Sequence, residues 1–330
     1  MRLFLFISTI ALPFALSPQA HAWGKRGHSI VCQTAAYLAS EDQPDASEPF
    51  FLKVHSFDLG YYCNVPDIIW KRPPTYEKEF FNHFMDMEIF ERKFPVKKGE
   101  DGDVPYALSR NAFDEKYKDF PKDAGRSWWR LRELEERLDE LTQKLKDKKL
   151  SSKEHQDMQV QWLLVSGIMG HYIGDMSMPL HVTENYDGKM SGQKGVHHYF
   201  EESAVDELFL QRNFGLEESV YKKALSLWSA YEQRAEKKDV FTLVKELTKD
   251  SQNEVSTVMK MDKKTGRKSI DRASQAFRSL IVERLAKGAL LEALVLKNHL
   301  GWEYDGKKFY QFLENPPFIE PPGDKGLPKK

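Results

Sequence analysis

The sequence predicts an all-α protein, built as a single mostly helical domain. Apolar residues recur at helical spacing through most of the chain, which is typical of helices with one buried face. One long charged segment also contains leucines in a heptad-like stripe. The chain contains no internal repeat and no clear linker, and its length suits one large domain. We therefore expect one domain over residues 23–314.

The segment before this domain has the three parts of a secretory signal peptide. Arg2 supplies the positive charge, residues 3–16 form an apolar stretch, and the Ala-His-Ala triplet at 20–22 is a small-residue cleavage site. An uncleaved membrane anchor is the alternative, but Pro13 and the cleavage triplet argue against it. No later stretch is apolar enough to span a membrane. We expect export to the periplasm or outside the cell, with Trp23 as the first residue of the mature chain.

Helices and loops are expected along the mature chain in the following order. Residues 28–39 form the first helix, and residues 41–75 contain proline and glycine, as expected of a loop with short helices. Residues 154–176 are the most apolar helical stretch, and residues 182–196 are a polar loop that contains glycine. The proline-rich tail 315–330 is expected to be disordered. Further helices are expected near 199–212, 217–236, 239–260 and 268–299.

The charged helix expected over residues 124–148 contains leucines at positions 131, 134, 138, 141 and 145. Such a stripe would suit a coiled coil with a partner protein. We favour a long amphipathic arm packed on its own domain. The sequence assigns this helix no function.

The overall charge is nearly neutral, which excludes one mode of binding. The chain has 49 Lys and Arg residues against 50 Asp and Glu residues, and removal of the leader takes away one arginine. A near-neutral protein does not bind polyanions through its net charge. A substrate that contains phosphate would therefore need a local site.

The two cysteines, Cys32 and Cys63, leave two alternatives open. Export would permit a disulfide between them. This bond would close a loop of about 30 residues and stabilise the fold by roughly 3–4 kcal/mol. Two buried free thiols are the other alternative.

Residues that could bind a metal concentrate in the stretch HYIGDMSMPLH and after it. His171 and Asp175 are four residues apart, so both project from one face of the expected helix. A buried histidine paired with an aspartate would explain this pair alone. His181 follows a Pro-Leu turn, however, and His197 and Glu201 repeat the four-residue spacing farther along the chain. Imidazole nitrogens and carboxylate oxygens in this pattern suit zinc.

Earlier segments add further candidates. Asp67 lies among apolar neighbours, where a lone carboxylate is costly unless it is paired or binds a metal. His83 lies in an aromatic run, and Trp23 and His28 open the mature chain. Each of these residues alone has an ordinary structural explanation, but their joint occurrence favours a metal centre. His198 could be the ligand in place of His197.

The combination of motifs resembles the S1/P1 nucleases, which are zinc enzymes related to bacterial zinc-dependent phospholipases C. The resemblance covers nearly the whole mature chain, because the motifs occur in the order of the family. Any one motif alone would be weak, but the set is specific. The motifs are WGKRGH at 23–28, VPD at 65–67, HFMD at 83–86, HYIGDMSMPLH at 171–181, HHYFE at 197–201 and RLA at 284–286.

The resemblance implies three zinc ions per chain. Asp175 would bridge the first two ions, and signal cleavage would have to free the amine of Trp23 before the second ion could bind. The implied ligands are Asp67, His83, His171 and Asp175 for the first ion, the amine and carbonyl of Trp23 with His28 and Asp175 for the second, and His181, His197 and Glu201 for the third.

The resemblance also implies the reaction, which is hydrolysis of a phosphodiester. Two zinc ions about 3.5–4 Å apart can share a hydroxide formed from water of pKa near 7, and this hydroxide would attack phosphorus in line. The third ion would neutralise charge on a phosphate oxygen and on the leaving alkoxide. Asp67 and Asp175 are the predicted catalytic residues, and Asp67 could also orient the attacking water. We expect a monomer without a stable protein partner.

The two kinds of protein that the chain resembles act on different substrates: the nucleases on nucleic acid and the phospholipases on phospholipid. Phe84 and Asp86 match the nuclease residues that stack on a base and hydrogen-bond to it, and stacking tolerates any base. For Phe84, ordinary core packing is the alternative. Glu201 instead matches the phospholipases, and the loop at 182–196 lacks the Gly-Gly-Asn of the nucleases.

We favour a nuclease that hydrolyses single-stranded DNA or RNA and 3′-nucleotides to 5′-phosphate products. A zinc-dependent phospholipase C acting on phospholipid is the alternative. A secreted zinc-binding protein without activity is a third hypothesis, which an open coordination position would argue against.

Overall fold

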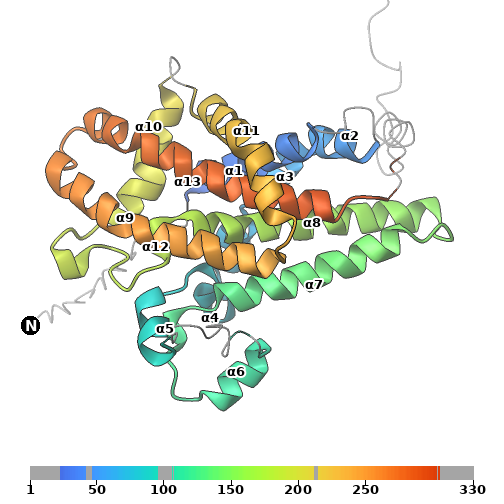
Figure 1. Ribbon diagram of the computed structural model, residues 1–330, viewed down its shortest axis with the longest axis horizontal. Helices are drawn as coiled ribbons and strands as arrows, with labels where there is room; N and C mark the ends of the chain where they lie inside the picture. Colours follow the sequence, from blue (N-terminus) through green and yellow to red (C-terminus); the bar gives the residue numbers. More distant parts are fainter. Residues whose placement is uncertain are drawn as a thin grey trace, which may run out of the picture.

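The computed structural model describes residues 23–41, 47–95, 106, 108–211, 215–302 and 304 (Figure 1). This part of the chain is all-α, which confirms the predicted class. It contains no β-strand, and only an isolated bridge joins Met85 to Gly125. A search of the same residues for a helix with the length and hydropathy of a membrane span finds none. The leader expected at 1–22 and the tail expected at 315–330 lie outside the described residues.

The first half of the chain combines three longer helices with several short ones. In order these elements are α1 (Lys25–Ala39), α2 (Ser47–Val54), α3 (Ser56–Tyr62), the π-helix η1 (Pro66–Trp70), α4 (Tyr76–Glu79), the 3-10 helix η2 (Phe80–His83), α5 (Met87–Lys93), α6 (Arg110–Lys116), the 3-10 helix η3 (Lys122–Ala124), α7 (Ser127–Leu145) and α8 (Ser152–Ser177).

The second half begins with short turns and ends with three long helices. In order these elements are the 3-10 helices η4 (Pro179–His181) and η5 (Lys189–Ser191), α9 (Val196–His198), the π-helix η6 (Tyr199–Ser203), α10 (Ala204–Leu210), α11 (Leu216–Ala235), α12 (Val240–Thr265) and α13 (Ile270–Asn298).

Helix α13 lies at the centre of the fold. It packs against α1, α8, α10, α11 and α12, so that it is covered on most sides (Figure 1). A helix in this position needs apolar residues around most of its circumference. Phe277, Leu285 and Leu291 are among its buried side chains. This packing holds α1 against α8, and the two helices together supply part of the candidate site.

The charged helix α7 packs along α8 as an arm of the same domain (Figure 1). The leucines at 131, 134, 138, 141 and 145 are all buried. The leucine stripe therefore packs within the chain, as we favoured, and does not form a coiled coil with a partner.

Helix α8 starts with a capping box, in which Ser151 and Glu154 satisfy each other's backbone N–H groups.

Two glycines of α8 allow α1 to approach closely. A Cβ atom on Gly170 would lie 2.3 Å from Sγ of Cys32, and one on Gly174 would lie 2.9 Å from Nδ1 of His28. Cys32 and Cys63 are buried free thiols; the thiol of Cys32 donates to the carbonyl of Gly167 at 3.8 Å, and burial raises the pKa of both cysteines. Of the two alternatives for the cysteines, the structure has the free thiols.

Candidate metal centre

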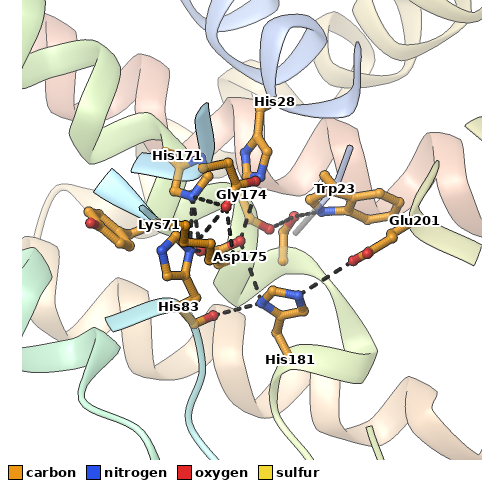
Figure 2. Close-up of polar contacts among 12 residues, drawn as sticks. Trp23, His28, Lys71, His83, His171, Gly174, Asp175, His181 and Glu201 are labelled. Carbon is orange, nitrogen blue, oxygen red and sulfur yellow. Dashed lines mark hydrogen bonds and ion pairs between the residues drawn. The ribbon is translucent and has the colours of Figure 1, made fainter. Parts of the chain in front are cut away.

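The predicted ligands converge on the C-terminal end of α8 from segments far apart in the chain (Figure 2). Helix α8 supplies His171 and Asp175, and the turn after it supplies His181. The other side chains come from the start of α1, from the short helices η1 and η2, and from α9 with η6. All of them are buried, and eight of them form three groups within which the possible ligand atoms lie within 4.8 Å of one another: Asp67, His83 and His171; His28, His171 and Asp175; and His181, His197 and Glu201.

The first group consists of Asp67, His83 and His171, and Asp175 lies beside it. Nδ1 of His83 lies 3.0 Å from Nε2 of His171, 3.1 Å from Oδ2 of Asp175 and 3.7 Å from Oδ1 of Asp67. Nε2 of His171 lies 3.5 Å from Oδ2 of Asp175 and 3.8 Å from Oδ1 of Asp67. Ligands at about 2.0–2.1 Å from a tetrahedral zinc lie about 3.3 Å apart. The spacing of this group is therefore close to that of a zinc site.

His83 has a carboxylate behind its ring that the sequence analysis missed. Oε1 of Glu79 lies 3.3 Å from Nε2 of His83, on the side of the ring away from the group. Glu79 also accepts hydrogen bonds from the hydroxyl of Tyr172 and from Nδ2 of Asn82. A carboxylate behind a histidine fixes the ring and raises its basicity as a ligand. The only signal in the sequence is the four-residue spacing between Glu79 and His83.

Lys71 is a second missed residue and the most unexpected one. Its Nζ atom lies 2.7 Å from Oδ1 of Asp67, and both side chains are buried. Burial alone would raise the pKa of Asp67, but Lys71 and His83 outweigh it and hold this pKa below its ordinary value. Burial would lower the pKa of Lys71, but Asp67 and Asp175 outweigh it and raise this pKa. The site therefore contains one buried ammonium among its carboxylates.

The second group joins His28 to the other oxygen of Asp175. Nε2 of His28 lies 3.6 Å and Nδ1 of His181 3.5 Å from Oδ1 of Asp175, whereas Oδ2 of the same carboxylate faces the first group. The ring of His28 stacks on that of His171 at 3.9 Å between centroids. His171 thus belongs to both groups, and its Nε2 atom faces His83. A carboxylate with its two oxygens divided in this way can bridge two cations.

Trp23 lies beside this second group. Its side chain is buried, its indole N–H donates to Oγ of Ser177 at 3.0 Å, and its carbonyl accepts from the backbone N–H of His28 at 3.2 Å. Arg284, in the RLA motif, donates to the carbonyl of Ser177 at 2.8 Å. These contacts hold the start of the expected mature chain at the end of α8.

The third group consists of His181, His197 and Glu201. Oε2 of Glu201 lies 2.9 Å from Nε2 of His197 and 3.5 Å from Nε2 of His181. Nδ1 of His181 is 2.6 Å from the carbonyl of His83, to which it donates, so its Nε2 atom has a free lone pair. His198 is 54% exposed and pairs with Glu202 at 3.1 Å. The side chain of His197, not that of His198, therefore faces the group.

The electrostatics of the three groups favour cations. Burial lowers the pKa of the five clustered histidines, in the case of His197 to about 3, so the imidazoles are neutral. Burial, followed by the charge of Asp67, raises the pKa of Asp175 well above its ordinary value, and burial raises that of Glu201. Both ring nitrogens of His28 and of His197 lack hydrogen-bond partners. Neutral imidazoles and carboxylates with such unsatisfied atoms fit zinc.

Phe84 and Asp86 follow His83 in the chain, on either side of Met85. The backbone N–H of Met85 donates to the carbonyl of His181 at 2.9 Å, which ties this segment to the end of α8. Phe84 is partly exposed, and its ring packs 5.6 Å from that of Phe80. Asp86 is buried, and burial, followed by the charge of Glu88, raises its pKa to about 8.

The fold and the site together define a class of protein, the all-α proteins with clustered, buried histidines and carboxylates that could hold metal ions. The sequence model of the S1/P1 Nuclease family matches residues 23–300, and the chain belongs to this family. S1/P1 nucleases are zinc-dependent hydrolases of phosphoester bonds and are typically secreted. No curated protein matches the sequence significantly.

Proposed function

We propose that this protein is an exported zinc-dependent phosphodiesterase that cleaves single-stranded DNA or RNA and 3′-nucleotides and leaves 5′-phosphates. Membership of the nuclease family supports the reaction class. The observation that supports the metal arrangement most strongly is the division of Asp175, whose Oδ2 atom faces His83 and His171 and whose Oδ1 atom faces His28 and His181.

Three zinc ions per chain are proposed, one for each group. Asp67, His83, His171 and Asp175 would hold the first, His28 and Asp175 with the terminal amine and carbonyl of Trp23 the second, and His181, His197 and Glu201 the third. When bound, zinc would supply an activated water near neutral pH and positive charge beside the phosphate.

The chain's own groups would prepare the site for this chemistry. Asp175 would hold two cations close together, and Asp67 would orient the attacking water as well as bind metal. Lys71 offsets the charge of Asp67. Glu79 fixes the ring of His83.

Phe84 and Asp86 are the proposed base-binding residues. Phe84 is partly exposed and follows His83 directly, and an exposed aromatic ring can stack on any base. With a pKa of about 8, Asp86 is a neutral carboxylic acid at pH 7, so it can donate a hydrogen bond as well as accept one.

A zinc-dependent phospholipase C is the second candidate, because a glutamate stands at position 201, as in the phospholipases. The two are separated by one assay, in which the protein that starts at Trp23 is incubated with zinc and offered single-stranded DNA, RNA, a 3′-nucleotide or phosphatidylcholine. The proposal expects cleavage of the first three. Cleavage of phosphatidylcholine alone would favour the phospholipase, and zinc binding without any cleavage would favour the non-enzymatic protein.

A further inference from the structure

The loop of residues 183–195, which leads into the third metal group, is fastened to the turn between α12 and α13. Arg267, in that turn, donates to the carbonyls of Gln193 and Lys194 at 2.8 and 2.9 Å. Gln193 donates in return to the carbonyl of Met259 and to Oδ2 of Asp262, both at 2.8 Å. The loop is therefore held in a defined position beside the third group.

The loop presents an aromatic ring next to a proposed metal ligand. The ring of Tyr186 lies 5.6 Å from that of His197 at an interplanar angle of 76°, and Tyr186 is 41% exposed. Nζ of Lys189 lies 5.8 Å from the centre of the Tyr186 ring. An exposed ring with a cation beside it is suited to stacking on a base whose phosphate is anionic.

The end of α12 and the turn that fastens the loop are strongly basic. Residues 260–268 contain four lysines and one arginine against a single acidic residue, although the whole chain is nearly neutral. Arg267 and Asp262 pair with each other at 2.8 Å. The exposed lysines around them have no ion-pair partner among the described residues; they are Lys194, Lys260, Lys263, Lys264 and Lys268.

Lysines at the end of α12 also stabilise that helix through its dipole. This explanation covers Lys263 and Lys264, but not Lys194 or Lys268, which lie outside the helix. What the lysines of the loop and of the turn have in common is that they lie on neighbouring segments. The hydrogen bonds of Arg267 bring these two segments together.

We propose that the 183–195 loop and the α12–α13 turn form a binding track for the single strand of a polynucleotide. Tyr186 stacks on a base next to the third metal group, and Lys189, Lys194, Lys263, Lys264 and Lys268 contact successive phosphates. The proposal rests on the proposed function and deepens it, because a track is of use to a polymer and not to a mononucleotide. A basic groove combined with aromatic rings is how proteins bind single strands without regard to sequence.

An anionic membrane is the other surface that lysines could bind. Among the described residues of the loop, Met190 is the only apolar aliphatic side chain that is strongly exposed, at 75%. Interfacial binding requires a broad apolar face. The aromatic ring beside the metal group therefore favours the nucleic acid.

The first test neutralises the track with the triple substitution Lys263→Gln, Lys264→Gln and Lys268→Gln. The zinc-loaded protein is given single-stranded oligothymidylate about 20 nucleotides long, and KM is measured as a function of salt. Each phosphate contact on a single strand contributes about 0.7 to the slope of log KM against log salt concentration. Loss of three contacts should therefore decrease this slope by about 2. The loss in kcat/KM for the oligonucleotide at low salt should exceed that for bis(4-nitrophenyl) phosphate about tenfold or more.

The matched control neutralises Lys146, Lys148 and Lys149, which are exposed in the turn between α7 and α8, at the opposite end of the molecule (Figure 1). This variant should keep the salt slope of the wild type. Equal slopes in both variants and the wild type would overturn the proposal. So would lysine-dependent binding to phosphatidylglycerol vesicles together with an unchanged slope on the oligonucleotide.

The second test replaces Tyr186. Tyr186→Ala should raise KM for the oligonucleotide about fivefold or more relative to the small diester, and Tyr186→Phe should restore it, because the ring and not the hydroxyl stacks. Tyr61→Ala, at a tyrosine 62% exposed on α3, is the control. Equal effects on both substrates would overturn the stacking role. If the wild type cleaves neither substrate, the proposed function fails; if it cleaves both with no effect of the track variants, only the track fails.

Discussion

The ammonium nitrogen of Lys71 lies 2.7 Å from Oδ1 of Asp67, and both side chains are buried. This is a buried ion pair within a proposed metal site, so a cation is present there whether or not a metal is bound. Removal of one partner from a buried pair leaves an uncompensated charge, which is strongly destabilising. Bound zinc would supply a replacement for that charge.

Lys71→Met should therefore destabilise the metal-free protein by about 3–5 kcal/mol and the zinc-loaded protein by much less. Urea unfolding with chelator and with zinc measures the difference. Lys53→Met, at an exposed lysine 4.0 Å from Glu41, should have little effect in either state. Equal destabilisation of Lys71→Met with and without zinc would argue against a metal next to Asp67.

Asp175→Asn should remove most of the activity, because Asp175 is proposed to bind two ions at once. The loss in kcat should exceed about a hundredfold, which is the upper end of the effect of changing an outer-shell partner. Metal analysis of the purified variant should find fewer than three zinc ions. Asp206→Asn, at an exposed residue paired with Arg26, is the control. Near wild-type hydrolysis by Asp175→Asn would contradict the bridging role.

One residue added before Trp23 should eliminate the second zinc ion, because the ligand would then be an amide nitrogen in place of a free amine. Two zinc ions per chain are expected in this variant and three in the protein that starts at Trp23. The same residue added at the C-terminus should leave three. Three zinc ions in the N-terminally extended protein would refute the role of the amine.

Phe84→Ala should weaken cleavage of single-stranded nucleic acid more than that of a small phosphodiester. Loss of one stacked base costs about 1–3 kcal/mol, which corresponds to a rise in KM of about fivefold or more. Phe57→Ala, at an aromatic residue 73% exposed on α3, should change neither substrate. Equal losses on the two substrates would mean that Phe84 only packs against Phe80 and Phe81.

Asp86 should make the stability of the protein depend on pH. Its pKa is about 8 in the fold, against an ordinary value of 3.8, so between these values the folded state holds a proton that the unfolded chain has lost. The stability therefore falls as the pH rises through this window, and the cost is complete above about pH 8.

Asp86→Asn removes this cost. The free energy of unfolding of the variant minus that of the wild type should therefore increase by about 1 kcal/mol or more from pH 5 to pH 9. Urea denaturation at the two pH values measures the gain, with Asp206→Asn as the control. A difference between variant and wild type that is the same at both values would mean that Asp86 is already ionised at pH 5.

The sequence was sufficient for much of the fold. The periodicity of α1, α7, α8, α11, α12 and α13 depends on residues three or four positions apart, so each helix could be predicted from its own segment. The leucines at 131–145 indicated a buried face but not its partner. That partner is α8, and only the packing of the two helices distinguishes an arm from a coiled coil between proteins.

The sequence by itself determined the class of the site, because histidine and carboxylate motifs in the family's order occur along the chain. The tertiary structure decided which atoms meet. It turned His197 inward and His198 outward, divided the oxygens of Asp175 between two groups, and buried Lys71 beside Asp67. The reason is physical: spacing along a helix is a local property, whereas the burial of a charge and the approach of segments about ninety residues apart depend on how α1, α8 and α13 pack.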